Sequence, residues 1–146
     1  MKKRYDILGI GNALVDIEVC VEDEFIERNS LTKGGMALSN IEEQQKVLQD
    51  LHGSSTKVSS GGSAANTIHG LSVLGGKAYY IGKVANDAHG QHYVEDMQSC
   101  GVAFIDPCNG LGDTGTCVIL VTPDSERTML THLGVSSLLQ PNDVDE

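Results

Sequence analysis

The chain has 146 residues, of which 40% are hydrophobic, and its 20 acidic against 10 basic side chains give a formal net charge of −10. This apolar content suffices for one packed domain or a part of one, and the acidic balance, with no Lys/Arg cluster beyond "KKR" at the start, argues against nucleic acid as a partner. No apolar run approaches the roughly 20 residues of a membrane span and no signal-peptide core develops, so we expect no membrane partner and a cytoplasmic location.

Strand and helix patterns alternate along the first hundred residues. Buried strands are predicted at residues 5–11 and 77–84 from their short apolar runs. Half-exposed strands are predicted at residues 17–22 and 55–60. Helices that end at glycines are predicted at three places: residues 40–53, 64–76 and 87–101, the last with Asp87 as its N-cap.

The last third of the chain has a different pattern. Residues 116–122 and 127–132 are two strand-like runs joined by a polar turn with Pro123, which predicts a hairpin. The simplest interpretation is an α/β core with right-handed βαβ crossovers and a separate small β element. Residues 136–146 have the composition of a helix start with Asn142 or Asp143 as the cap. We therefore expect the chain to be the N-terminal part of a longer protein.

Cysteine and histidine spacing gives no sign of a metal site or a disulfide framework. His89 and His92 lie one helical turn apart, but no second pair of ligands stands nearby in the sequence. Four cysteines are present without a C-x-x-C pair: Cys20, Cys100, Cys108 and Cys117. We expect no metal and reduced thiols, which agrees with a cytoplasmic protein.

The first strand ends in a G-x-G pair, Gly9 and Gly11, as a dinucleotide-binding loop would begin. Such a loop needs a third glycine where this chain has Leu14, and an acidic residue about 20 positions further on. The first acidic residue here is Asp16, so the dinucleotide interpretation fails. Two alternatives stay open: Asp16 and Asn12 bind vicinal hydroxyls of a ligand, or Asp16 caps a turn beside a left-handed Asn12.

A second candidate segment is "GGSAAN", residues 61–66. Gly61 and Gly62 allow close approach of the backbone to a ligand, and the helix that follows offers free N–H groups, with Asn66 in its first turn. The alternative is a tight connection without a ligand, in which Ser63 is the N-cap.

Together these segments resemble the ribokinase-like (PfkB) family of carbohydrate and nucleoside kinases. "GNALVD" at 11–16 is similar to the family's G-x-x-x-x-D, and "GGSAAN" is similar to its G-G-x-x-x-N at a helix start. "GKVANDAHG" at 82–90 is similar to its GxVGxDxxG segment. Two departures are Ile68, where a small residue is usual, and Ala85, where a glycine is common.

The resemblance implies a ribokinase-like, doubly wound α/β sheet with a small β lid, of which residues 1–146 would be the N-terminal portion. Lid strands would lie near residues 17–21, 55–60 and 114–132. The implied reaction is transfer of the ATP γ-phosphoryl group, with Mg²⁺, to a hydroxymethyl oxygen of a sugar or nucleoside. The family's catalytic base belongs to a G-A-G-D motif that this chain lacks, so we expect the C-terminal ATP-binding half to be absent and the isolated chain to be inactive.

The resemblance also implies substrate-binding residues. Asn12 and Asp16 would bind ring hydroxyls, with Gly61, Gly62, Ser63 and Asn66 of "GGSAAN" binding others. "TGTCVILVTPDSERTM" is most similar to the adenosine-kinase-like branch, which suggests further residues for the base or sugar pocket: Met36, Cys117, Met129, Thr131 and Leu133. Arg127 would reach toward the transferring phosphate. The alternative for these lid residues is ordinary packing or solvation.

Several matters stay open at this point. The acceptor could be adenosine, another nucleoside, ribose, fructose or a deoxy-keto-sugar acid, and two copies could pair through the lid as a homodimer. A non-catalytic module that binds a small polyol or nucleoside is the alternative function.

Overall fold

The computed structural model describes residues 4–105 and 112–144, so Cys108 lies outside the described residues. The chain divides into two compact units. The first unit takes the described residues of Met1–Val15, Ser59–Gly115 and Leu133–Glu146, and the second takes Asp16–Val58 and Thr116–His132. In the described ranges, no helix has the length and apolar character needed to cross a membrane.

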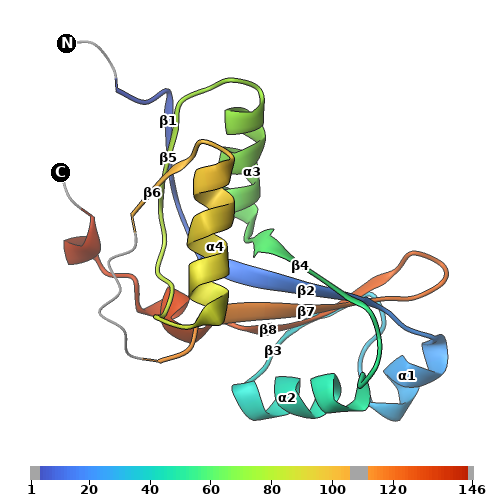
Figure 1. The fold of residues 1–146 in the computed structure, drawn as a ribbon. Coiled ribbons are helices and arrows are strands. Elements are labelled where there is room, and N and C mark those ends of the chain that lie inside the picture. Colours follow the sequence, from blue (N-terminus) through green and yellow to red (C-terminus); the bar gives the residue numbers. More distant parts are fainter. Residues whose placement is uncertain (1–3, 106–111, 145–146) are drawn as a thin grey trace. The chain divides into compact units, whose positions relative to one another are not determined.

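The first unit contains a three-stranded parallel sheet (Figure 1). Its strands are β1 (Ile7–Ile10), β5 (Ala78–Ile81) and β6 (Ala103–Ile105), in the order β1-β5-β6. Helix α3 (Ser63–Val73) leads into β5 and helix α4 (Ala88–Ser99) leads into β6, and both strands run parallel to their neighbours in the sheet. This is the α/β arrangement that the alternating patterns predict.

Both helices of this unit pack on the same face of the sheet. Ile68 of α3, Tyr93 and Met97 of α4, and Tyr80 of β5 belong to one buried cluster. The side chains of β1 are more exposed than is usual in a parallel sheet, with Leu8 52% exposed. Within the described residues, the helical layer therefore covers one face of this sheet.

The second unit contains most of a five-stranded sheet in the order β3-β8-β7-β2-β4. Strand β7 (Gly115–Val121) and strand β8 (Arg127–His132) form the predicted antiparallel hairpin, with Thr116 opposite His132. The remaining strands are β2 (Leu14–Cys20), β3 (Met36–Leu38) and β4 (Thr56–Gly61), and β2 and β4 each run on into the first unit.

One face of this sheet is covered by two helices, α1 (Asp23–Arg28) and α2 (Ile41–Asp50). The covered face is apolar, because every second residue of the strands joins a core with the helices: Ile17, Val19, Val118, Leu120 and Leu130 from the sheet, Phe25, Ile26, Val47 and Leu51 from the helices and their ends. Asn40 caps α2 in a reciprocal capping box with Glu43.

Gln44 of α2 is 1% exposed, and its amide ties the helix to the hairpin. It donates to the carbonyl oxygens of Thr116 (3.0 Å) and Leu130 (2.8 Å), and it accepts from the Thr116 hydroxyl (2.6 Å). A buried amide with three partners is fully compensated for its loss of water.

The longer predicted elements are confirmed, including the N-cap role of Asp87, which accepts from the backbone N–H of Gly90. The pattern missed the short elements α1, β3 and β6. It was wrong for the C-terminal end, where the described residues form two 3₁₀ turns, Gly134–Leu138 and Pro141–Asp143, the second beginning after Gln140. Such short elements carry too few residues for a periodic signal.

Candidate functional site

The "GGSAAN" segment forms the junction of β4 and α3, in the first unit. Gly62 occupies the N-cap position with φ of 99°, and a Cβ atom there would lie 2.4 Å from the backbone oxygen of Asn12. Only glycine fits this position without strain. Ser63 is the first helical residue and does not cap the helix through its side chain, so the alternative of a Ser63 N-cap is wrong. The first N–H groups of α3 are therefore not satisfied by a capping side chain.

The loop after β1 packs against the start of α3. A Cβ at Gly11 would lie 3.0 Å from that of Ala64, and a Cβ at Gly9 would lie 2.5 Å from Ile68. The G-x-G pair thus serves helix packing, and Gly9 gives room to the unusually large Ile68. This packing brings the backbone of Asn12 against Gly62, close to Ser63 and Asn66, whose side chains are exposed.

A second group of predicted residues shares one face of the sheet in the second unit. Because side chains alternate along a strand, the residues that do not face α1 and α2 point to the opposite face. Cys117 lies opposite Thr131 and Met36 lies opposite Met129 in the strand register. The Thr131 hydroxyl donates to the Cys117 sulfur at 3.4 Å. The face opposite the helices, which we call the open face, therefore carries six predicted residues: Asp16, Met36, Cys117, Arg127, Met129 and Thr131.

Asp16 is a half-buried carboxylate on the open face, and within the described residues it accepts no hydrogen bond from the protein. Burial and the neighbouring charge of Glu18 raise its pKa above the ordinary value, while Arg127 acts in the opposite direction. The environment therefore disfavours the ionised form, although a ligand that donates hydrogen bonds would favour it. This is not the pattern of a turn-capping aspartate, which accepts from nearby backbone N–H groups.

Arg127 is paired with a residue that sequence reasoning missed. Its Nη2 lies 3.5 Å from Oε2 of Glu18, two residues beyond Asp16 on the same face of β2. Alternation of Asp16 and Glu18 along the strand was the available signal. Leu133 directly follows the end of β8 and is counted with the first unit.

Cys117 is a buried thiol whose pKa is raised above its ordinary value. Burial has the largest effect and raises its pKa, the hydrogen bond from Thr131 lowers it by less, and the charge of Asp16 raises it by less still. A thiol in this state contributes a small apolar surface rather than a nucleophile.

Comparisons with known proteins show the family of the chain. The model of the "pfkB family carbohydrate kinase" matches residues 34–146. The chain belongs to the pfkB family. It is 29% identical over 96% of its length to a guanosine-inosine kinase of Escherichia coli K12, of which it covers 34%. It is 26% identical over 90% of its length to adenosine kinase 2 of Arabidopsis thaliana, of which it covers 39%.

Solved structures extend the likeness to the fold. The adenosine kinase of Sinorhizobium meliloti is 39% identical with a TM-score of 0.89, and the alignment covers 98% of this chain and 43% of that one. A probable sugar kinase of Rhizobium etli CFN 42 is 40% identical with a TM-score of 0.88, over 97% of this chain and 43% of that one. The fold is thus ribokinase-like, and the chain spans less than half the length of these pfkB relatives.

The pfkB segment "GKVANDAHG" has a structural role in this chain. Asp87 accepts from the backbone N–H of Thr114 (2.8 Å) and from its hydroxyl (2.7 Å), and the Thr114 hydroxyl accepts from the N–H of Ala85 (2.9 Å). A Cβ at Gly90 would lie 2.0 Å from the Ala85 oxygen, so glycine is required there. These residues fix the start of α4 and do not form part of the candidate site.

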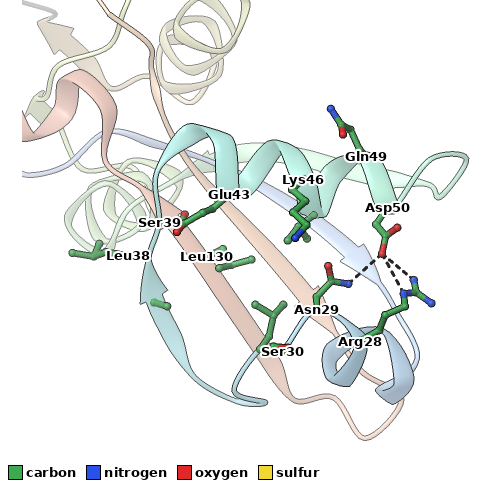
Figure 2. Close-up of a pocket in the computed structure, with 13 residues that line it drawn as sticks. Arg28, Asn29, Ser30, Leu38, Ser39, Glu43, Lys46, Gln49, Asp50 and Leu130 are labelled. Atoms are coloured by element: carbon green, nitrogen blue, oxygen red, sulfur yellow. Dashed lines mark hydrogen bonds and ion pairs between the residues drawn. The ribbon is translucent and has the colours of Figure 1, made fainter.

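A groove of the second unit lies on the other side of its sheet from the open face. It has a volume of about 840 Å³ and runs between the end of α1, strand β3 and helix α2. The Asp50 carboxylate accepts hydrogen bonds from Arg28 at 3.2 Å and from Asn29 at 3.3 Å. Both contacts are drawn in Figure 2. None of the predicted site residues lines this groove. A smaller hollow of about 340 Å³ is lined in part by Met36 and Met129.

Proposed function

We propose that this chain supplies the substrate-binding part of a purine-nucleoside kinase. The observation that carries the proposal is Asp16: a half-buried carboxylate, disfavoured by its surroundings and without a protein hydrogen-bond donor among the described residues. A protein keeps such a destabilised carboxylate where a ligand compensates it. Two neighbouring hydroxyls of a ribose would donate to its two oxygens.

The other candidate residues would contact two parts of the nucleoside, the ribose and the purine ring. Asn12, Asn66 and the first N–H groups of α3 would hydrogen-bond the remaining ribose oxygens. Met36 and Met129, adjacent in the β3–β8 register, would offer apolar and polarizable surface to a purine ring. The guanosine-inosine kinase and the adenosine kinase among the relatives support a purine nucleoside as the acceptor.

The proposed reaction transfers the γ-phosphoryl group of ATP, with Mg²⁺, to the hydroxymethyl oxygen of the nucleoside. Among the described residues, no three His, Cys, Asp or Glu side chains are grouped to hold a metal ion. The sequence also lacks the G-A-G-D motif of the catalytic base. We therefore assign no catalytic step to these residues, and Arg127 is proposed only as a contact to the phosphate.

The test is ADP release by the full-length gene product that contains this chain, with adenosine, guanosine, ribose, fructose and 2-keto-3-deoxygluconate as acceptors. Turnover with a purine nucleoside, and little with the free sugars, is the expected result. Turnover with a sugar alone would overturn the nucleoside assignment. Binding of adenosine without any turnover would favour the alternative, a non-catalytic nucleoside-binding module.

Pairing of two copies through the lid is part of the same proposal. Strand β3 is an edge strand, and its Met36 and Leu38 are 61% and 66% exposed. An edge with exposed apolar side chains invites pairing with another strand. Light scattering on the purified protein should give twice the mass of the monomer. The Met36→Lys variant should give the mass of one monomer.

A further inference from the structure

Two side chains of α4 hold the last residues of β4, immediately before the loop that the proposed function assigns to the substrate. The Tyr93 hydroxyl donates to the backbone oxygen of Gly61 at 3.2 Å. One carboxylate oxygen of Asp96 accepts from the Ser60 N–H at 3.1 Å and from the Ser60 hydroxyl as well. Tyr93 and Asp96 are three residues apart and so project from the same face of the helix.

These contacts are well supported energetically. Tyr93 is 0% exposed and its ring packs against Phe104 at a centroid distance of 5.5 Å, so the position of its hydroxyl oxygen is fixed by the packing of the ring. Burial raises the pKa of Asp96, but the two hydrogen bonds from Ser60 outweigh it, with help from the charges of His92 and His69, so that its pKa lies below the ordinary value. Asp96 is thus an ionised acceptor, whose hydrogen bonds are the stronger kind.

The peptide plane transmits this hold to the loop. The Gly61 oxygen and the Gly62 N–H belong to one planar peptide unit, in which they point in opposite directions. Fixing the Gly61 oxygen on Tyr93 therefore directs the Gly62 N–H away from α4. Glycine at position 62 has a positive φ and a wide choice of backbone conformations, so an outside contact is needed to select one.

We propose that Tyr93 and Asp96 are positioning residues, which hold the Gly61–Gly62 peptide so that its N–H donates to a hydroxyl of the bound nucleoside. This inference rests on the proposed function for the identity of the ligand. Tyr93 and Asp96 touch no substrate in this proposal, and no motif of the sequence indicates them. Their effect on the substrate is exerted through Ser60 and Gly61.

The first experiment measures the loop directly, by hydrogen exchange of the backbone amides from residue 60 to residue 65. Tyr93→Phe removes one hydroxyl and keeps the ring, and Asp96→Asn removes one charge and keeps the size. Both should accelerate exchange at the loop by roughly tenfold, because the lost hydrogen bonds restrain local opening. Glu95→Gln is the matched control, since Glu95 is exposed on the same helix and bonded to Gln91. Unchanged loop exchange in both variants overturns the proposal.

The second experiment measures adenosine affinity by calorimetry on the same full-length variants. Tyr93→Phe and Asp96→Asn should each weaken binding by roughly tenfold, while Glu95→Gln leaves it unchanged. A merely structural role would lower the melting temperature but leave the affinity of the folded protein intact, and that result overturns the positioning role. Ser60→Thr, which keeps the hydroxyl, should bind more tightly than Ser60→Ala. If the unmodified protein binds no adenosine, the proposed function fails, and with it the step from loop to substrate.

Discussion

Replacing Asp16 by asparagine separates ligand binding from stability. The asparagine has the same shape but no charge. Its NH₂ group replaces one of the two carboxylate oxygens, so it cannot accept a hydrogen bond from the second hydroxyl of the ligand. At least one charge-assisted hydrogen bond is lost, which amounts to about 1.5–3 kcal/mol and to about a 10- to 150-fold rise in the Kd for adenosine.

The stability of the same variant should move in the opposite direction. The pKa of Asp16 is raised in the folded protein by burial and by Glu18, so the folded state binds its proton more tightly than the unfolded state does. The loss of folding free energy that comes from ionising Asp16 is absent at pH values below its pKa in the unfolded state. It is fully present at pH values above its pKa in the folded state. At neutral pH, Asp16→Asn should therefore leave the melting temperature unchanged or raise it.

The assay is calorimetric titration with adenosine and thermal unfolding of the full-length protein at pH 7, with Glu18→Gln as the control. Glu18→Gln removes the same charge two residues away on the same face, and should leave adenosine affinity within about threefold. A fall of more than about 4 °C in the melting temperature of Asp16→Asn, with unchanged affinity, would show that Asp16 has a structural role and refute the reasoning.

Three further substitutions test the fold around the site. Gly62→Ala should destabilise the protein by about 1–3 kcal/mol or more, because its φ is positive and a Cβ would meet the Asn12 oxygen; equal stability in urea unfolding would contradict this. Gln44→Ala leaves two buried carbonyls without their amide donor and should cost about 2–5 kcal/mol, against less than about 1 kcal/mol for the exposed Gln49→Ala, as measured by the same method. Asp87→Ala removes the cap of α4 and two hydrogen bonds from Thr114. Burial raises the pKa of Asp87, but these hydrogen bonds together outweigh burial and leave the pKa below its ordinary value, so the stabilisation by Asp87 should be lost as the pH falls through the acid range. A stability difference from wild type that does not shrink at low pH would be the contrary result.

The long elements and the two motifs could be read from the sequence alone. Helices such as α2 and α4 carry enough turns for a periodic pattern, and Asp87 marks the start of α4 through a contact within four residues. The same is true of the β7–β8 hairpin, whose strands are joined by a short turn. Contacts between residues that are close in the sequence determine these features, so the local sequence is enough to predict them.

The grouping of the candidate residues was decided only by the tertiary structure. Cys117 and Thr131 share a contact because of strand register, and Met36 joins them through β3, an element of three residues with no pattern of its own. The hydrogen bonds of Tyr93 and Asp96 reach residues more than 30 positions earlier in the chain, and no pattern of neighbouring residues indicates them. Such contacts depend on which helix packs over which strand end, a long-range choice that hydrophobic periodicity leaves open because it specifies a buried face but not the residue that will meet it.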